Sequence, residues 1–313
     1  MAEALVASPV VLGFVGDSGS GKTTVARGVA SIIGEDRVAF LSVDDYHRYS
    51  RAERFQRGLA PADPDNNYLD IAEQHLGLLR RGQPILKPVY DHGPGELVEP
   101  EYVAPKPYII VEGLMGFATR KLRDCYDVKV FLDPDEPLRV AWKTQRDTRR
   151  RGYTADQVEE TIRTAAVAAA RFVQPQRRHA DVVVQFLAVG DGAEDEASER
   201  LGVRHILRPT LPHPELTPLL ETASGIGVTL ELGRDGDGMP VDRLEISALI
   251  DDLQARRLER YLWDLVPETG GMHDTLGRFE DAQAGETSHA LALTQLLMAY
   301  HLQRAAIDRA GDG

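Results

Sequence analysis

The sequence lacks the features that mark secreted, membrane-spanning and nucleic-acid-binding proteins. Its 313 residues include a single cysteine, Cys125, so no disulfide can form within the chain, and a cytoplasmic location is the default expectation. No apolar run approaches the roughly 20 residues of a membrane span. The first residues, MAEALVASPVV, carry none of the positive charge of a signal peptide. The net charge of −13 disfavours nucleic acid and anionic membranes as partners.

What is present is an ordinary globular composition, 27% charged and 42% hydrophobic, in a chain long enough for one large domain and an addition. Strand-like apolar runs alternate with helical patterns through the first two-thirds. This alternation predicts an α/β fold, a parallel sheet with helices on both faces. The predicted strands are 9–15, 38–43, 108–112, 128–132 and 181–187, and the predicted helices are 23–33, 70–81, 137–151 and 154–172.

A glycine-rich loop after the first predicted strand is the most specific motif. Residues 16–23 read GDSGSGKT, the pattern G-x-x-x-x-G-K-[ST] between a strand and a helix. The glycines let backbone N–H groups converge on phosphates. Lys22 adds a charge near the β and γ phosphates, and the Thr23 hydroxyl is placed for Mg²⁺. The loop predicts a nucleoside triphosphate site, formed by Gly16, Asp17, Ser18, Gly19, Ser20, Gly21, Lys22, Thr23 and Thr24.

The acidic, non-periodic segment 190–202 is expected to link a P-loop kinase domain, residues 1–189, to a C-terminal mixed α+β extension, residues 203–313. In the extension we predict strands at 203–208, 226–232 and 241–246 and helices at 248–265 and 287–309. One apolar face of the last helix, expected to pack on the body, holds Leu293, Leu296, Leu297 and Tyr300. We expect the extension to add strands to the sheet and to support a homodimer.

Two predicted strands end in carboxylates. Asp44 and Asp45 follow the strand 38–43, where a carboxylate can accept the proton of an attacking hydroxyl. Asp44 is nearer the strand end and is our candidate base, whereas Asp45 is interpreted as a turn or cap residue. The strand 108–112 ends in Glu112, at a Walker B position that holds an acid near Mg²⁺.

Basic residues gather in the predicted helix 137–151 of this acidic protein. Lys143, Arg146 and Arg150 share one face, at positions i, i+3 and i+7. A solvated basic face is one interpretation. The other is a set of cations that closes over transferring phosphates, with a mobile lid beginning at Gly152.

A shaped loop is expected at residues 87–92, KPVYDH, because Gly93, Pro94 and Gly95 follow it. It offers Tyr90 and His92. Without other information, a packed tyrosine beside a surface histidine is its default interpretation.

Taken together, these segments resemble the phosphoribulokinase/uridine kinase family, and within it the phosphoribulokinases of plants and cyanobacteria. The resemblance spans about residues 10–184 through GDSGSGKTT, SVDDYHRYSR, KPVYDHGPGELVEP, YIIVEG, AWKTQRD, RRGYT and PQRRHADVV. It implies ATP-dependent phosphorylation of ribulose 5-phosphate at its 1-hydroxyl to ribulose 1,5-bisphosphate, a Calvin-cycle reaction. Mg²⁺ is the implied cofactor beside ATP, and a sugar phosphate is the implied small-molecule partner.

The resemblance also implies roles for single residues. Asp44 takes the place of the catalytic base, and Glu112 that of the Walker B acid. Asp147 matches an acidic residue beside the cations of transfer. The family's basic residues of phosphate binding and transfer correspond to Lys143, Arg146 and Arg151. Its sugar-phosphate contacts correspond to His47, Arg51, Tyr90 and His92, and we expect Arg151 to join them, while Lys22 of the phosphate loop is expected to act with the cations of transfer.

The chain departs from the family pattern in three places. Ser20 stands where plant enzymes carry a redox-active cysteine, so thiol regulation of that kind cannot operate. Met115 and Gly116 replace the usual His-Pro after the Walker B strand. Thr164 and Ala165 stand where an arginine-lysine pair is expected.

Two other functions stay open. One is a uridine/cytidine kinase, or another small-molecule kinase, on the same scaffold, against which the match at His47, Arg51 and His92 argues. The other is a non-catalytic nucleotide-binding regulator, against which the intact Lys22, Asp44 and Glu112 argue.

Overall fold

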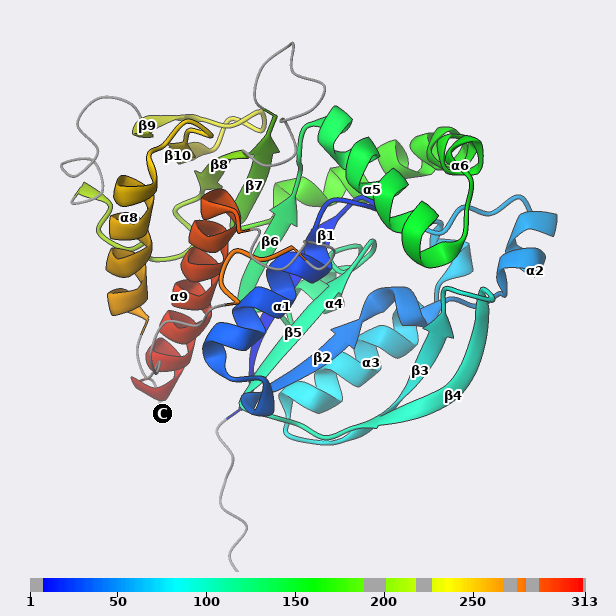
Figure 1. Cartoon of the computed structure of the whole chain (residues 1–313). Helices are drawn as coiled ribbons and strands as arrows, with labels where there is room; N and C mark the ends of the chain where they lie inside the picture. The colour runs from blue at the N-terminus through cyan, green and yellow to red at the C-terminus, as the bar shows by residue number, and fades with distance from the viewer. Residues whose placement is uncertain (1–7, 189–200, 218–226, 267–274, 280–286, 312–313) are drawn as a thin grey trace, which may run out of the picture. The chain divides into compact units, whose positions relative to one another are not determined.

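The computed structural model describes residues 8–188, 201–217, 227–266, 275–279 and 287–311 (Figure 1). They form two compact units. The first comprises residues 8–19, 35–129 and 140–179, and the second comprises residues 20–34, 130–139 and the described residues from 180 onward. Within these described ranges, no helix combines the length and the apolar character needed to cross a bilayer.

The sheet of the first unit has three parallel strands in the order β2-β5-β1 (Figure 1). They are β1 (Val10–Gly16), β2 (Val38–Ser42) and β5 (Tyr108–Gly113). Every residue of β1 is buried, as expected for an apolar strand covered on both faces. Glu112 lies opposite Phe14 on one side and Ser42 on the other. The carboxyl ends of the three strands therefore meet at one edge, where ligands of parallel sheets bind.

The helices of the first unit are α2 (Arg51–Gln56), α3 (Leu69–Arg80), α4 (Arg120–Arg123), most of α5 (Glu136–Arg151) and α6 (Ala155–Ala168). Thr154 and Gln157 start α6 with a capping box, each side chain binding the other's backbone N–H. The helix predicted at 154–172 is confirmed, but the α-helix itself ends at Ala168. The last part of the predicted range is a π-helical turn, Ala169–Val173.

Residues 85–103 form an antiparallel hairpin, so the predicted loop at 87–92 is wrong. Its strands are β3 (Ile85–Asp91) and β4 (Glu96–Val103). Gly95 closes the turn with a φ of 80° and donates its N–H to Asp91 O at 2.9 Å. The register shifts between Lys87 and Val89. This irregularity at Pro88 breaks the alternation by which a strand is recognised in a sequence.

The second unit continues as a mixed sheet, in the order β6-β7-β8-β10-β9. β6 (Val128–Leu132), which ends in this unit, runs parallel to β7 (Val182–Leu187). Antiparallel strands follow: β8 (Gly202–Leu207), β10 (Pro240–Ile246) and β9 (Val228–Arg234). The predicted α/β class with a mixed extension that adds strands is confirmed. The predicted domain boundaries stay predictions, and the predicted linker at 190–202 lies almost wholly outside the described residues.

Three helices of the second unit pack together: α1 (Lys22–Ile33), α8 (Asp252–Leu265) and α9 (His289–Gly311). Of the predicted apolar face of the last helix, the three leucines are buried and Tyr300 is half-buried, and burial extends around α9 from Ala290 to Ala299. At Gly28 of α1, a Cβ would lie 2.0 Å from Gln295 Nε2, so a side chain there would force Gln295 to move. Gln295 Nε2 also donates to Thr24 O at 3.3 Å. Helix α9 thus holds the helix that begins with Lys22.

Candidate functional site

The phosphate loop turns through two glycines with left-handed backbone. Gly19 has a φ of 85° and Gly21 a φ of 87°, conformations that residues with a Cβ rarely adopt. Gly21 caps α1, which begins at Lys22. Asp17 Oδ1 accepts the N–H of Ser18 at 2.6 Å. The predicted order of strand, glycine loop and helix is confirmed, while the binding roles of residues 16–24 stay predictions.

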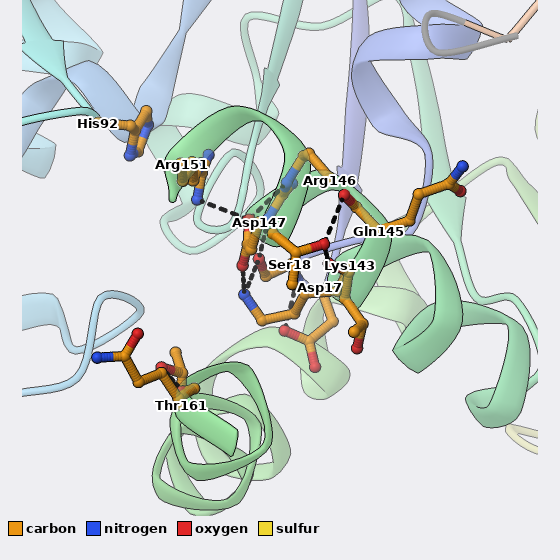
Figure 2. Close-up of polar contacts among 12 residues, drawn as sticks. Asp17, Ser18, His92, Lys143, Gln145, Arg146, Asp147, Arg151 and Thr161 are labelled. Atoms are coloured by element: carbon orange, nitrogen blue, oxygen red, sulfur yellow. Dashed lines mark hydrogen bonds and ion pairs between the residues drawn. The ribbon is translucent and has the colours of Figure 1, made fainter. Parts of the chain in front are cut away.

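Asp147 gathers three cations from its own helix (Figure 2). Its Oδ2 lies 2.7 Å from Lys143 Nζ, and its Oδ1 lies 2.9 Å from Arg146 Nε and 3.4 Å from Arg151 Nη1. Burial raises the pKa of the Asp147 carboxyl, but Arg146 and Lys143 outweigh burial and hold the pKa below its ordinary value. Asp147 is therefore ionised at neutral pH and orients the three cationic side chains.

Two of these cations also contact the phosphate loop. Lys143 Nζ lies 3.4 Å from Ser18 Oγ, and Arg146 Nη2 lies 3.3 Å from the same oxygen (Figure 2). The predicted basic face divides, since Lys143 is buried and Arg146 half-buried while Arg150 is exposed. A solvated face does not describe Lys143 and Arg146, which contact the phosphate loop, while their role in transfer stays a prediction.

The neighbouring carboxylates Asp44 and Asp45 have different partners. Both lie in a 3-10 turn, Val43–Tyr46, that follows β2. Asp44 Oδ1 accepts the N–H of Leu114 at 2.8 Å, and its other oxygen has no hydrogen-bond partner in the described part of the chain. Asp45 uses both oxygens: Oδ1 accepts the N–H of Tyr90 at 3.0 Å, and Oδ2 lies 2.5 Å from Lys87 Nζ. Asp44 is thus the carboxylate with an oxygen left for an acceptor hydroxyl.

The glycine after Glu112 gives Asp44 its place. Gly113 has a φ of 154°, and a Cβ there would lie 3.1 Å from Asp44 Oδ1 and 3.0 Å from Val43 Cβ. A side chain at this position would push the candidate base away from the strand end.

His47, Tyr90 and His92 form an edge-to-face row of rings. Ring centroids are 4.8 Å apart for His47 and Tyr90 and 5.2 Å apart for Tyr90 and His92. His47 Nδ1 lies 2.8 Å from Asn67 Oδ1 and 3.2 Å from Asn66 Nδ2, so two asparagine side chains hold the ring in place. Burial lowers the pKa of His47, and burial and then Arg151 lower the pKa of His92 to about 4. Both rings are therefore neutral at pH 7.

Arg51 connects this row to the end of α5. Its Nη2 donates to His92 O and its Nη1 to Gly93 O at 3.3 Å. The Arg51 guanidinium carbon lies 5.6 Å from the centroid of the Tyr153 ring, a cation–π distance. Tyr153 in turn donates its N–H to Asp147 O at 3.2 Å.

Four residues have partners in this region although the sequence alone assigned them no role. Lys87 and Tyr153 are described above. Arg54 Nε is buried without a hydrogen-bond partner among the described residues, although its Nη1 donates to Leu59 O at 3.3 Å. Gln176 Nε2 donates to Leu114 O, and its Oε1 accepts the N–H of Phe117, both at 2.8 Å. Gln176 thereby fixes the loop whose Leu114 N–H binds Asp44; its only sequence signal is its place in PQRRHADVV.

A glycine loop after a parallel strand, carboxylates at the ends of two neighbouring strands, and cations against the loop define a P-loop phosphotransferase. A model of the Phosphoribulokinase / Uridine kinase family matches residues 11–192, more than half of the chain. The chain belongs to this family, whose members phosphorylate hydroxyl groups.

Individual relatives agree with this assignment. The phosphoribulokinase of Synechocystis is 31% identical over 260 residues, 78% of each chain. The chloroplastic phosphoribulokinase of Triticum aestivum is 28% identical over 220 residues, which are 65% of this chain but 54% of the wheat protein. A uridine kinase of Geobacillus kaustophilus is 35% identical over 186 residues, 56% of this chain. The chain thus spans little more than half the length of its wheat relative.

A solved structure gives the same fold. The phosphoribulokinase from Rhodobacter spheroides superposes with a TM-score of 0.58 at 19% identity, covering 83% of this chain and 97% of that one. The likeness extends over far more of the chain than the family model does, and it confirms the predicted fold class.

Proposed function

We propose that this chain is an ATP-dependent kinase that converts ribulose 5-phosphate to ribulose 1,5-bisphosphate. The observation that carries the proposal is a second group of cations beyond the phosphate loop. Arg51 and Arg151 gather with the row of His47, Tyr90 and His92, whereas Lys143 and Arg146 contact Ser18. A nucleoside acceptor carries no phosphate, so a nucleoside kinase has no need of the second group. A sugar phosphate needs it.

The candidate base supports phosphoryl transfer to a hydroxyl. One oxygen of Asp44 is held by Leu114 N–H, and the other is left to accept the acceptor's proton. In-line attack then requires chiefly positioning and stabilisation of charge on the γ oxygens. We assign that stabilisation to Lys22, Lys143 and Arg146, with Asp147 holding the last two in place.

The donor set suits ATP with Mg²⁺. Oxygen ligands are the ones that Mg²⁺ prefers, and the residues that would hold it are Thr23, in the first turn of α1, and Glu112, half-exposed at the end of β5. When bound, Mg²⁺ would supply positive charge that offsets the negative charge of the phosphates. The phosphate-loop backbone, turned at Gly19 and Gly21, would bind the phosphates by its N–H groups.

One comparison tests the proposal. ATP turnover is measured with ribulose 5-phosphate, uridine and pantothenate side by side, and with Asp44→Asn as the inactive control. We expect ribulose 5-phosphate to be the preferred acceptor. Faster phosphorylation of uridine or cytidine, with ribulose 5-phosphate inert, would overturn the proposal in favour of the second candidate, a uridine kinase, which the Geobacillus kaustophilus relative represents.

We also propose a cellular location and an oligomeric state for the enzyme. The single cysteine favours the cytoplasm, and the charge of −13 argues against nucleic-acid partners. We propose a homodimer supported by the C-terminal extension. A monomer mass in light scattering would reject the dimer, and recovery from a membrane or secreted fraction would reject the location.

A further inference from the structure

The hairpin β3–β4 is tied to the base-bearing turn by a buried ion pair that the proposed mechanism does not use. Lys87 Nζ lies 2.5 Å from Asp45 Oδ2, and the Lys87 side chain is 6% exposed. Its other contacts are Pro88 O at 3.3 Å and Glu101 Oε2 at 3.5 Å, where the Glu101 side chain is 61% exposed. Asp45 is therefore the principal counter-charge of Lys87.

The irregularity in β3 makes this pair possible. Side chains alternate between the two faces of a regular strand, so residues three apart point in opposite directions. Lys87 and Tyr90 are three apart, yet both are buried and both meet Asp45, one through its side chain and one through its N–H. The register shift between Lys87 and Val89 interrupts the alternation, so that Lys87 and Tyr90 can lie on the same side of the strand.

The pair fixes the ring row relative to Asp44. Tyr90 packs against His47 and His92, and the His92 carbonyl accepts from Arg51. A shift of β3 would therefore move the residues that are proposed to bind the acceptor. Lys87 also neutralises a carboxylate beside the candidate base, where a second free negative charge would repel a phosphorylated acceptor.

We propose that Lys87 and Asp45 are positioning residues that select a phosphorylated acceptor by holding β3 against the turn of Asp44. This inference rests on the proposed function. Neither residue needs to touch substrate. Their effect passes through the backbone of Tyr90 and reaches His92 and Arg51.

The experiment compares Lys87→Met, Asp45→Asn, the double variant and Lys87→Arg in steady-state kinetics, varying ATP and ribulose 5-phosphate separately. Lys87→Met leaves a buried carboxylate unpaired, and small misplacements of acceptor groups are costly. We expect its KM for the acceptor to rise about tenfold or more, with the KM for ATP within about twofold of the wild type. Lys87→Arg should restore most of the loss, because it keeps the charge.

The double variant separates positioning from misfolding. It removes both charges, while the amide oxygen introduced by Asp45→Asn can still accept the N–H of Tyr90, so its acceptor KM should rise by less than the product of the single effects. Glu101→Gln, at the exposed partner of Lys87, is the matched control and should change neither KM. Equal rises in both KM values, or full additivity in the double variant, would refute the inference. An inert wild type would instead refute the proposed function.

Discussion

Acidification should destabilise this protein, in part through two histidines buried in its second unit. His205 of β8 is fully buried, with Nε2 2.9 Å from Thr294 Oγ1. Thr294 gives its own proton to Ala290 O at 2.7 Å, so it accepts from His205. His205 Nδ1 is then a buried acceptor without a partner among the described residues. His301 of α9 is 2% exposed. Burial lowers the pKa of each imidazole from 6.5 to about 3.

The direction and the size of the stability change follow from the coupling between proton binding and folding. At pH 5 both histidines are neutral in the folded protein, whereas in the unfolded chain, with an ordinary pKa of 6.5, each takes up a proton. Stability is present in full above about pH 6.5 and is lost as the pH falls toward 3. Between 6.5 and 5 each histidine costs about 2 kcal/mol, at about 1.36 kcal/mol per pH unit. The pair thus removes about 4 kcal/mol of a total that is typically about 5–15 kcal/mol.

Urea unfolding at pH 7.5 and pH 5 measures this loss. In His205→Gln the loss on acidification should be smaller than in the wild type by about 2 kcal/mol, because one titrating group is gone. His289 is the matched control of opposite sign: Glu259 and then Asp252 outweigh burial and raise its pKa, so its stabilisation is present at low pH and lost as the pH rises. His289→Gln should therefore lose more on acidification than the wild type. An unchanged pH dependence in His205→Gln would refute the reasoning.

Three further outcomes concern the site. Asp44→Asn should lower kcat by about 10²-fold or more while ATP still binds, because general-base catalysis is typically worth that much; near-normal kcat would move the base elsewhere. Arg51→Ala and Arg151→Ala should raise the KM for the sugar phosphate by about one to two decades, the cost of a charge-assisted contact, with less effect on ATP; a selective effect on ATP would place these arginines on the nucleotide side. Oxidant and reductant should leave activity unchanged, because Ser20 is no thiol and Cys125 has no second cysteine in the chain; reversible loss on oxidation in the wild type, absent in Cys125→Ser, would reveal an intermolecular disulfide.

The parallel core was predictable from sequence because its strands are buried on both faces and read as continuous apolar runs. β1 and β5 were found in this way, and their ends shifted by only a residue or so. The hairpin β3–β4 was missed for a physical reason. Nearly all of β4 is exposed, and its apolar residues fall in adjacent pairs that do not alternate with polar ones, while Pro88 interrupts the alternation in β3. Hairpin pairing of this kind is decided by partners that no local pattern reveals.

The site divided in the same way. The spacing of Lys143, Arg146 and Arg150 predicted a shared basic face, of which Arg150 is exposed, whereas Asp147 was indicated only by the family resemblance. Asp45 was interpreted as a turn residue, because its partner Lys87 is 42 positions away. Gln176 reaches Leu114 across 62 positions. Local motifs therefore indicated which residues are candidates for the chemistry, but they did not indicate which residues hold those candidates in place.

The charge distribution explains how a protein of net charge −13 can take two anionic substrates. Screening at physiological ionic strength acts over about 8 Å, so distant surface carboxylates contribute little at the site. Around Asp147, three cations face one carboxylate, which leaves a local excess of two positive charges. Without Asp147 these cations would repel one another in a partly buried space; a second carboxylate among them would halve the excess positive charge that attracts phosphate. Charge is also balanced near the candidate base. Lys87 neutralises Asp45, which leaves Asp44 as the carboxylate with an oxygen available to an acceptor hydroxyl.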